Sequence, residues 1–240
     1  MSGCCTAHGC GSPTSTHSSS FADSAALSER HVVSSTKLIA NCQDCRLGTL
    51  TVSCPIMDKE GQPCSICNGA GTRLHRHSIV QMEGPVPNSI LLLGEAPGVH
   101  EDLEGLPFRP HAPAGRVLHK ALDELGMAPA IDNVVRCRPP ENKLKDYPDT
   151  LATCRDKWLP MILSLVSPRV IVPLGALAGG LWFPGMKATE MSQMARACVM
   201  DGVEYIVVGS LHPSYVARGT DPTAYGSLLA SLRRAVELAK

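Results

Sequence analysis

The chain has 240 residues, which is enough for one full-sized domain with a small attachment. Lysine and arginine together number 22, as do aspartate and glutamate, so the formal net charge is zero. This balance excludes a protein held on nucleic acid by a global basic charge, although it does not exclude a local basic patch. The 11 cysteines are unusual, because a chain of this length can bury a sufficient core without disulfides.

The N-terminal residues 1–22 are rich in Ser, Thr, Gly and Cys and offer little to bury, so we expect a disordered tail. This segment lacks the basic start and apolar centre of a secretory signal. No apolar run reaches the roughly 20 residues that span a bilayer. We therefore expect a cytoplasmic protein without membrane contact, in which cysteines serve metal binding or catalysis. Cys4, Cys5 and Cys10 are expected to be free thiols of the tail, with metal ligation as the alternative.

The segment 24–40 has the apolar spacing of a helix and leads into a Gly-, Pro- and Cys-rich stretch, within which we place an insert at about 49–75. From residue 89 onward, short apolar runs alternate with segments of helical spacing. The predicted strands are Ser89–Leu93, Ile131–Val135, Arg169–Leu174 and Glu204–Val208. The predicted helices are Gly115–Leu125, Asp149–Val166, Ala176–Leu181 and Thr223–Leu238. The alternation predicts an α/β domain over residues 23–240, with three layers (α/β/α) and a central four-stranded, mostly parallel sheet.

In sheets of this kind, ligands bind beyond the carboxyl ends of the strands. Three of the loops at that edge carry unusual residues. The first contains Gly94-Glu-Ala-Pro-Gly98, then Glu101-Asp102 and Gly105-Leu-Pro-Phe108. The second contains Asn133-Val-Val-Arg-Cys137-Arg-Pro-Pro140, and the third contains His212-Pro-Ser214. Polar and glycine-rich loops at one edge of a sheet indicate a functional site there.

In this order, the motifs resemble those of the iron–sulfur uracil-DNA glycosylases, commonly called family 4, over residues 36–239. The resemblance implies a monofunctional DNA glycosylase. Such an enzyme flips a uracil or modified pyrimidine into a pocket and hydrolyses its N-glycosidic bond to leave an abasic site. The partner would be single- or double-stranded DNA, and we expect a monomer.

The resemblance also implies roles for three pocket residues. Phe108 would stack on the flipped base. Asn133 would read the Watson–Crick edge of the base, although an amide can pair with uracil or, once flipped, with a cytosine-like edge. His212 would lie near O2 of the base and stabilise the negative charge that develops when the bond breaks.

The remaining site residues follow from the same resemblance. Glu95 and the backbone of the turn that includes Gly98 would position the water and the base. Glu101 would line the pocket near the pyrimidine 5-position and disfavour thymine. Ala96 occupies the place where other branches of the superfamily carry a water-activating aspartate, so catalysis would depend on stabilising the leaving group. The expected DNA contacts are Ser214, Tyr215, Arg218, Arg136 and Arg138.

The resemblance further implies a [4Fe–4S] cluster held by an N-terminal C-x-x-C pair and two later cysteines. Cys137 and Cys154 match the later pair. The N-terminal pair has two candidates. We favour Cys42 and Cys45, because an apolar helix leads into them, and Cys64 with Cys67 is the alternative.

The insert has its own possible chemistry. Cys64 and Cys67 begin a C-x-x-C-x-G-x-G pattern typical of a zinc knuckle, and with Cys54 and either His75 or His77 they could form a Cys₃His zinc site. A zinc ribbon of Cys42, Cys45, Cys64 and Cys67 and a set of free thiols are the alternatives. Cys198 is expected to be a small buried apolar residue.

Two departures from the family pattern concern the substrate. The insert is one, and the longer link from Arg109 to Gly115, directly after Phe108, is the other. Extra residues beside the stacking ring would reshape the pocket wall. An alternative substrate is therefore a bulky base such as glucosylated hydroxymethylcytosine in phage DNA. A non-catalytic sensor of damaged bases is a further alternative, against which Asn133 and His212 argue.

Overall fold

The computed structural model describes residues 42, 44–49, 51–53, 72–74 and 79–240. The described residues all belong to one compact unit, which covers residues 31–240. The predicted tail, the predicted helix over 24–40 and the zinc candidates Cys54, Cys64, Cys67, His75 and His77 lie outside the described residues. Among the helices of the described part, none has both the length and the apolar character that a membrane span requires.

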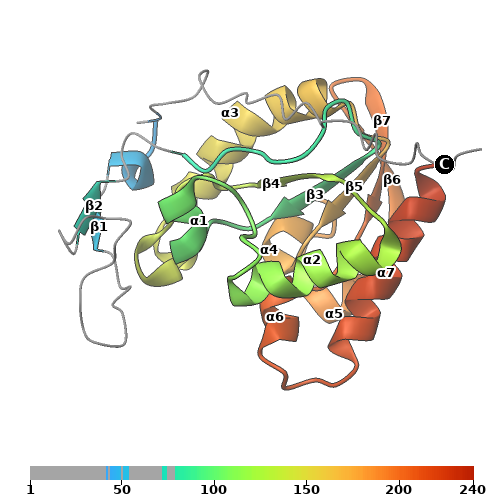
Figure 1. The fold of residues 1–240 in the computed structure, drawn as a ribbon. Coiled ribbons are helices and arrows are strands. Elements are labelled where there is room, and N and C mark those ends of the chain that lie inside the picture. The colour runs from blue at the N-terminus through green and yellow to red at the C-terminus, as the bar shows by residue number, and fades with distance from the viewer. Residues whose placement is uncertain (1–41, 43, 50, 54–71, 75–78) are drawn as a thin grey trace, which may run out of the picture. The chain divides into compact units, whose positions relative to one another are not determined.

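A five-stranded sheet lies at the centre of the fold (Figure 1). Its strands are β3 (Ile90–Gly94), β4 (Ala130–Asn133), β5 (Val170–Pro173), β6 (Ala195–Met200) and β7 (Val203–Val208). They are ordered β4-β3-β5-β7-β6, with four strands parallel and β6 antiparallel to β7. The predicted α/β class and mostly parallel sheet are confirmed.

The predicted number of strands was one too few, because β6 was missed. This strand lies at the sheet edge and is largely exposed, so its sequence has no continuous apolar run. Cys198 lies in β6 and is partly exposed, so the expectation that it is buried was wrong.

Helices cover both faces of the sheet (Figure 1). The helices are α1 (Val99–Glu104), α2 (Pro113–Leu125), α3 (Pro148–Val166), α4 (Ala176–Gly179), α5 (Ala188–Met191), α6 (Pro213–Ala217) and α7 (Ala224–Leu238). Leu91 and Leu93 of β3 pack in one core cluster with residues of α3, whereas Ile90 and Leu92 pack in the other with residues of α2 and α7. This alternation along a single strand, buried on both faces, produces the three layers.

A separate two-stranded ribbon precedes the sheet along the chain. Its strands, β1 (Thr51–Ser53) and β2 (Thr72–Leu74), pair antiparallel with Ser53 opposite Thr72. Ser53 and Thr72 are therefore held next to each other.

Candidate active site

The loops that follow β3, β4 and β7 meet at the carboxyl edge of the sheet and enclose a pocket of about 390 Å³. The sequence-predicted residues that line it are Glu95, Ala96, Gly98, Glu101, Phe108, His212, Ser214 and Arg218. Ala114, Pro139 and Asn142 also line the pocket and were not predicted. Residues from three separate parts of the chain are thus brought into one cavity.

Gly94, at the end of β3, allows two of the predicted residues to meet. A Cβ atom at this position would lie 2.3 Å from Oδ1 of Asn133 and 2.7 Å from the ring of Phe108. Gly94 also pairs with Asn133 in the register of β3 and β4. Any side chain at Gly94 would therefore displace the amide of Asn133, the ring of Phe108, or both.

The carboxylate of Glu101 holds the turn and Phe108 together. Its Oε2 accepts a hydrogen bond from the N–H of Gly98, and its Oε1 accepts one from the N–H of Phe108 at 2.9 Å. Burial raises the pKa of the Glu101 carboxyl, and the two backbone donors and Arg109 act in the opposite direction. Both carboxylate oxygens are thus occupied in fixing the backbone of the pocket.

Phe108 has a backbone conformation that is unusual for a residue with a side chain. Its φ is +44°, and its side chain is almost fully buried. Besides the bond to Glu101, its carbonyl oxygen lies 2.9 Å from Nε2 of His119. Gly115 allows the backbone to approach, because a Cβ there would lie 2.5 Å from the same carbonyl oxygen. Strained conformations of this kind persist where surrounding contacts fix them, and they concentrate at functional sites.

His212 forms the opposite side of the pocket. It is the N-cap residue of α6, and its Nδ1 accepts a hydrogen bond from the N–H of Ser214 at 3.1 Å, with the Ser214 hydroxyl at 2.7 Å. Burial, and to a lesser extent the charge of Arg218, lowers the pKa of His212 to about 4. Because an amide must donate, Nδ1 is the acceptor and the single proton of the neutral ring is on Nε2. The imidazole ring lies 5.8 Å from the Phe108 ring between centroids.

Asn133 is buried and does not line the pocket wall, although it contacts the Gly94 position beside Phe108. Its Nδ2 has no hydrogen-bond partner in the described part of the chain. An unpaired buried donor costs roughly 1–3 kcal/mol, so a ligand acceptor at this atom would be stabilising. Glu95, which does line the pocket, has its pKa raised by burial.

Four cysteines lie together beside the active-site loops. Cys42, Cys45, Cys137 and Cys154 share an apolar cluster with Leu47, Ile79 and Trp158. None of the four forms a disulfide within the described part of the chain. Burial and the proximity of the other three raise the pKa of Cys137, and burial is the main cause that raises the pKa of Cys154 to about 11. Cysteine side chains this close to one another form a candidate metal site, because a bound cation stabilises their thiolate forms.

The four cysteines present four sulfur atoms as candidate metal ligands. By softness and geometry, four thiolates suit either an iron–sulfur cluster or a zinc ion.

The model of the uracil DNA glycosylase superfamily matches residues 82–233, which include every residue that lines the pocket. The chain belongs to this superfamily. It is 34% identical to the type-4 uracil-DNA glycosylase of Thermotoga maritima over 155 residues, which are 63% of this chain and 78% of the relative. It is 29% identical to the type-4 enzyme of Pyrobaculum aerophilum over 160 residues, which are 63% of this chain and 80% of the relative.

Two of the residues expected to contact DNA in this superfamily member are buried in the structure. Arg136 is 1% exposed, because its guanidinium pairs with Asp132 and lies over the Trp158 ring. Arg138 is 6% exposed, and its Nε donates to Oδ1 of Asn142 at 3.0 Å. Both were predicted because positive charges beside a functional loop are usually exposed.

The other three expected contacts of this superfamily member lie in or beside the pocket. Ser214 and Arg218 line the pocket. The guanidinium of Arg218 lies over the ring of Tyr215, whose hydroxyl donates to Asp221 at 3.3 Å. A rigid aromatic and a cation are thus placed next to the cavity, in helix α6 and at its end.

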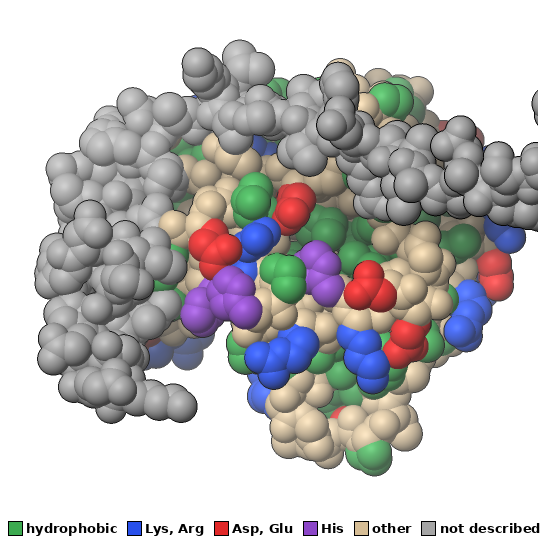
Figure 2. Space-filling model, in the orientation of Figure 1, with side chains coloured by type: hydrophobic (Ala, Val, Ile, Leu, Met, Phe, Trp, Pro, Cys, Tyr) green, Lys and Arg blue, Asp and Glu red, His purple; other side chains and the backbone are tan. Residues whose placement is uncertain are grey.

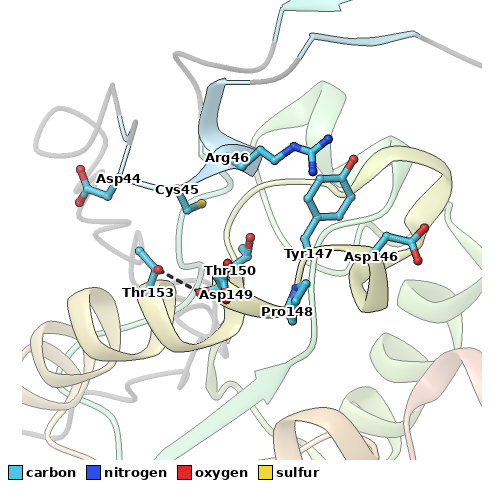
Figure 3. Close-up of a pocket in the computed structure, with 9 residues that line it drawn as sticks. All are labelled: Asp44, Cys45, Arg46, Asp146, Tyr147, Pro148, Asp149, Thr150 and Thr153. Carbon is cyan, nitrogen blue, oxygen red and sulfur yellow. Dashed lines mark hydrogen bonds between the residues drawn. The ribbon is translucent and has the colours of Figure 1, made fainter.

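A second pocket, of about 260 Å³, opens beside the cysteines (Figure 3). Cys45 lines this pocket and is partly exposed, whereas the other three cysteines of the group are buried. Asp44, Asp146 and Asp149 lie around it, and Arg46 lies over the ring of Tyr147. Solvent therefore reaches the four-cysteine group from the side of Cys45.

The low pKa of His212 can be measured directly. We expect the ring signals of His212 in NMR spectra to be constant from pH 8 down to about pH 5.5, because burial and Arg218 disfavour the charged ring. An exposed imidazole would titrate with a midpoint near 6.5. The signals are assigned by their absence in His212→Asn.

Arg218→Gln provides the matched variant for this measurement. Removing the charge of Arg218 should raise the pKa of His212 only slightly, because burial is the larger cause of its low value. A midpoint of about 6 or higher in the unmodified protein would contradict the neutral, Nε2-protonated ring.

Proposed function

We propose that this protein is a DNA glycosylase that removes uracil from DNA and leaves an abasic site, as in base-excision repair. The names of its relatives as type-4 uracil-DNA glycosylases support this function. The single observation that carries it is the neutral His212 ring, with its proton on Nε2, facing the same pocket as the buried Phe108. A neutral donor beside an aromatic face suits a planar base that leaves as an anion.

Base binding would begin with stacking on Phe108. Because Glu101 and His119 already fix the backbone of Phe108, the ring needs no reorganisation when the base arrives. The unpaired Nδ2 of Asn133 would donate to O4 of uracil, and Oδ1 would accept from N3–H. Uracil would thereby satisfy a donor that is buried and unpaired without it.

Bond cleavage would depend on stabilising the departing base. When the N-glycosidic bond breaks, its electron pair goes to the base and negative charge accumulates at O2. Nε2–H of His212 would donate to that oxygen, and Ser214 keeps the ring in the correct orientation and tautomer. Ala96 has no group to activate water, so Glu95 would position the water that attacks the sugar carbon.

The DNA backbone would bind at the pocket mouth. Ser214 and Arg218 would contact phosphate oxygens, and Tyr215 would fill the space that the flipped nucleotide leaves. Binding through few cations predicts modest, salt-sensitive affinity, in line with a net charge of zero.

We also propose that Cys42, Cys45, Cys137 and Cys154 bind a [4Fe–4S] cluster. Four iron–thiolate bonds would hold the cluster and cross-link distant parts of the chain. The role of the cluster would be structural. The support is the grouping of the four cysteines in one cluster. Lys157, whose ammonium lies 3.9 Å from the sulfur of Cys42, would partly neutralise the negative charge of the thiolates.

The role of His212 is tested by single-turnover excision from an oligonucleotide that contains uracil. His212→Ala should lower the excision rate about 10²- to 10³-fold, because a preorganised donor to the leaving group is lost. Arg233→Gln, an exposed change on α7, serves as the control and should leave the rate unchanged. Equal formation of abasic sites by His212→Ala and the unmodified enzyme would show that this role is wrongly assigned.

A bulky modified pyrimidine is the second candidate substrate, because Ala114 of the lengthened link lines the pocket. Oligonucleotides with uracil, thymine, hydroxymethylcytosine and glucosylated hydroxymethylcytosine distinguish the candidates. We expect uracil to be excised fastest and thymine not at all, because Glu101 lines the pocket and would lie near the 5-position of the base. If only the glucosylated base were excised, that base and not uracil would be the substrate. If the oligonucleotides were bound but no base were excised, the protein would be a sensor of damaged bases.

The cluster ligands are tested by metal and sulfide analysis of protein purified without oxygen. Cys42→Ser and Cys137→Ser should each lose most of the iron and acid-labile sulfide. Cys198→Ser, in the exposed edge strand, should retain both. Loss of iron in Cys64→Ser but not in Cys42→Ser would instead assign the N-terminal ligands to the insert.

A further inference from the structure

Three potential metal ligands lie together outside the pocket, on α1 and the link after Phe108. Nε2 of His111 is 3.2 Å from Nδ1 of His100 and 2.9 Å from Oε1 of Glu104. All three ligand atoms lie within 4.8 Å of one another. Histidine, acidic and basic side chains gather on the face of the molecule shown in Figure 2. None of the three residues lines the pocket or takes part in the proposed excision.

The local sequence explains why these residues meet. His100 and Glu104 are four residues apart on α1, so their side chains lie on one face of that helix. His111 precedes α2 and belongs to the link from Arg109 to Gly115, which is longer than in the family that the sequence resembles. The lengthened link thus supplies the third ligand to a helix that already presents two.

Hydrogen bonds alone do not pair all the polar atoms of these three side chains. Nε2 of His111 has one proton at most, yet it has two close polar neighbours. A single proton on Nε2 points well at only one of them. A metal ion between the three atoms would bind all of them at once, since each offers a lone pair when the rings are neutral and the carboxylate is ionised.

The spacing matches a small tetrahedral ion. Zn–N bonds of about 2.0–2.1 Å hold tetrahedral ligand atoms roughly 3.3–3.4 Å apart, and carboxylate oxygens bind at similar lengths. The two measured separations, 3.2 and 2.9 Å, are close to that value. The two rings are also nearly perpendicular, at 88°, so their nitrogen lone pairs can converge without stacking.

Neighbouring charged side chains orient the carboxylate of Glu104. Nε of Arg109 donates to Oε2 of Glu104 at 2.8 Å, which leaves Oε1 directed at His111. Arg109 is itself held by Glu83 at 3.3 Å. Glu104 and His111 are exposed, so an ion can enter from solvent.

We propose that His100, Glu104 and His111 bind one divalent transition-metal ion of the zinc class, with water as the fourth ligand. Two imidazoles and a carboxylate suit zinc and its neighbours better than calcium or magnesium. The ion would join the link after Phe108 to α1, the helix whose Glu101 holds the N–H of Phe108. It would thus stabilise the segment that carries the stacking ring.

Zinc equilibrium dialysis of the full chain tests the site, with the zinc content per chain as the readout. His111→Asn and Glu104→Gln should each bind one zinc ion fewer than the unmodified protein, or bind it more than about 100-fold more weakly, since loss of even an outer partner costs 10- to 100-fold. Glu124→Gln, an exposed carboxylate on α2, is the matched control and should retain the ion. Circular dichroism verifies that each variant is folded.

Zinc bound by cysteines elsewhere in the chain would be equal in all of these proteins, so the difference between them reports this site alone. X-ray absorption at the zinc edge should show a nitrogen- and oxygen-ligated component that is missing in His111→Asn. Equal zinc content and affinity in the unmodified protein and His111→Asn would overturn the proposal and leave a hydrogen-bonded surface group. An equal loss in Glu124→Gln would overturn it as well.

Discussion

The carboxylate of Glu101 is the interaction on which the pocket depends. It accepts hydrogen bonds from the N–H groups of Gly98 and Phe108, which lie on opposite sides of α1 in the sequence. These two bonds, the contact of the Phe108 carbonyl with His119 and the burial of the Phe108 ring together offset the cost of the left-handed backbone at Phe108. A residue expected from the sequence to exclude thymine therefore also determines where the stacking ring lies.

The two sides of the pocket are fixed by different physical means. Hydrogen bonds to a carboxylate hold the side of Phe108, whereas the N-cap of α6 holds His212. At the N-cap, Ser214 fixes the tautomer and burial fixes the charge, so the ring is a neutral donor. The sheet sets the distance between the two sides, since β3 and β7 are each paired with β5. The spacing of 5.8 Å between the rings thus follows from the fold.

Much of this arrangement could be predicted from the sequence, and the failures have a common cause. The buried strands and long helices were found because a continuous apolar run or helical spacing directly reflects burial. Strand β6 was missed because an exposed edge strand has no such pattern. Arg136 and Arg138 were wrongly placed at the surface because the partners that permit their burial, Asp132 and Asn142, are recognisable only in three dimensions. The proton position on His212 likewise depends on a hydrogen bond that spacing alone does not reveal.

The loop after β4 connects Asn133 to the four-cysteine group. Asp132 accepts hydrogen bonds from the N–H of Asn133 and from Arg136, and so fixes the backbone that carries the unpaired amide. Cys137 follows directly after Arg136, and the N–H of Arg136 bonds to the sulfur of Cys154. The four-cysteine group and the amide of Asn133 are therefore connected through one buried ion pair. Arg136 cannot move without leaving the charge of Asp132 buried and unpaired, so this ion pair fixes the loop between Asn133 and Cys137.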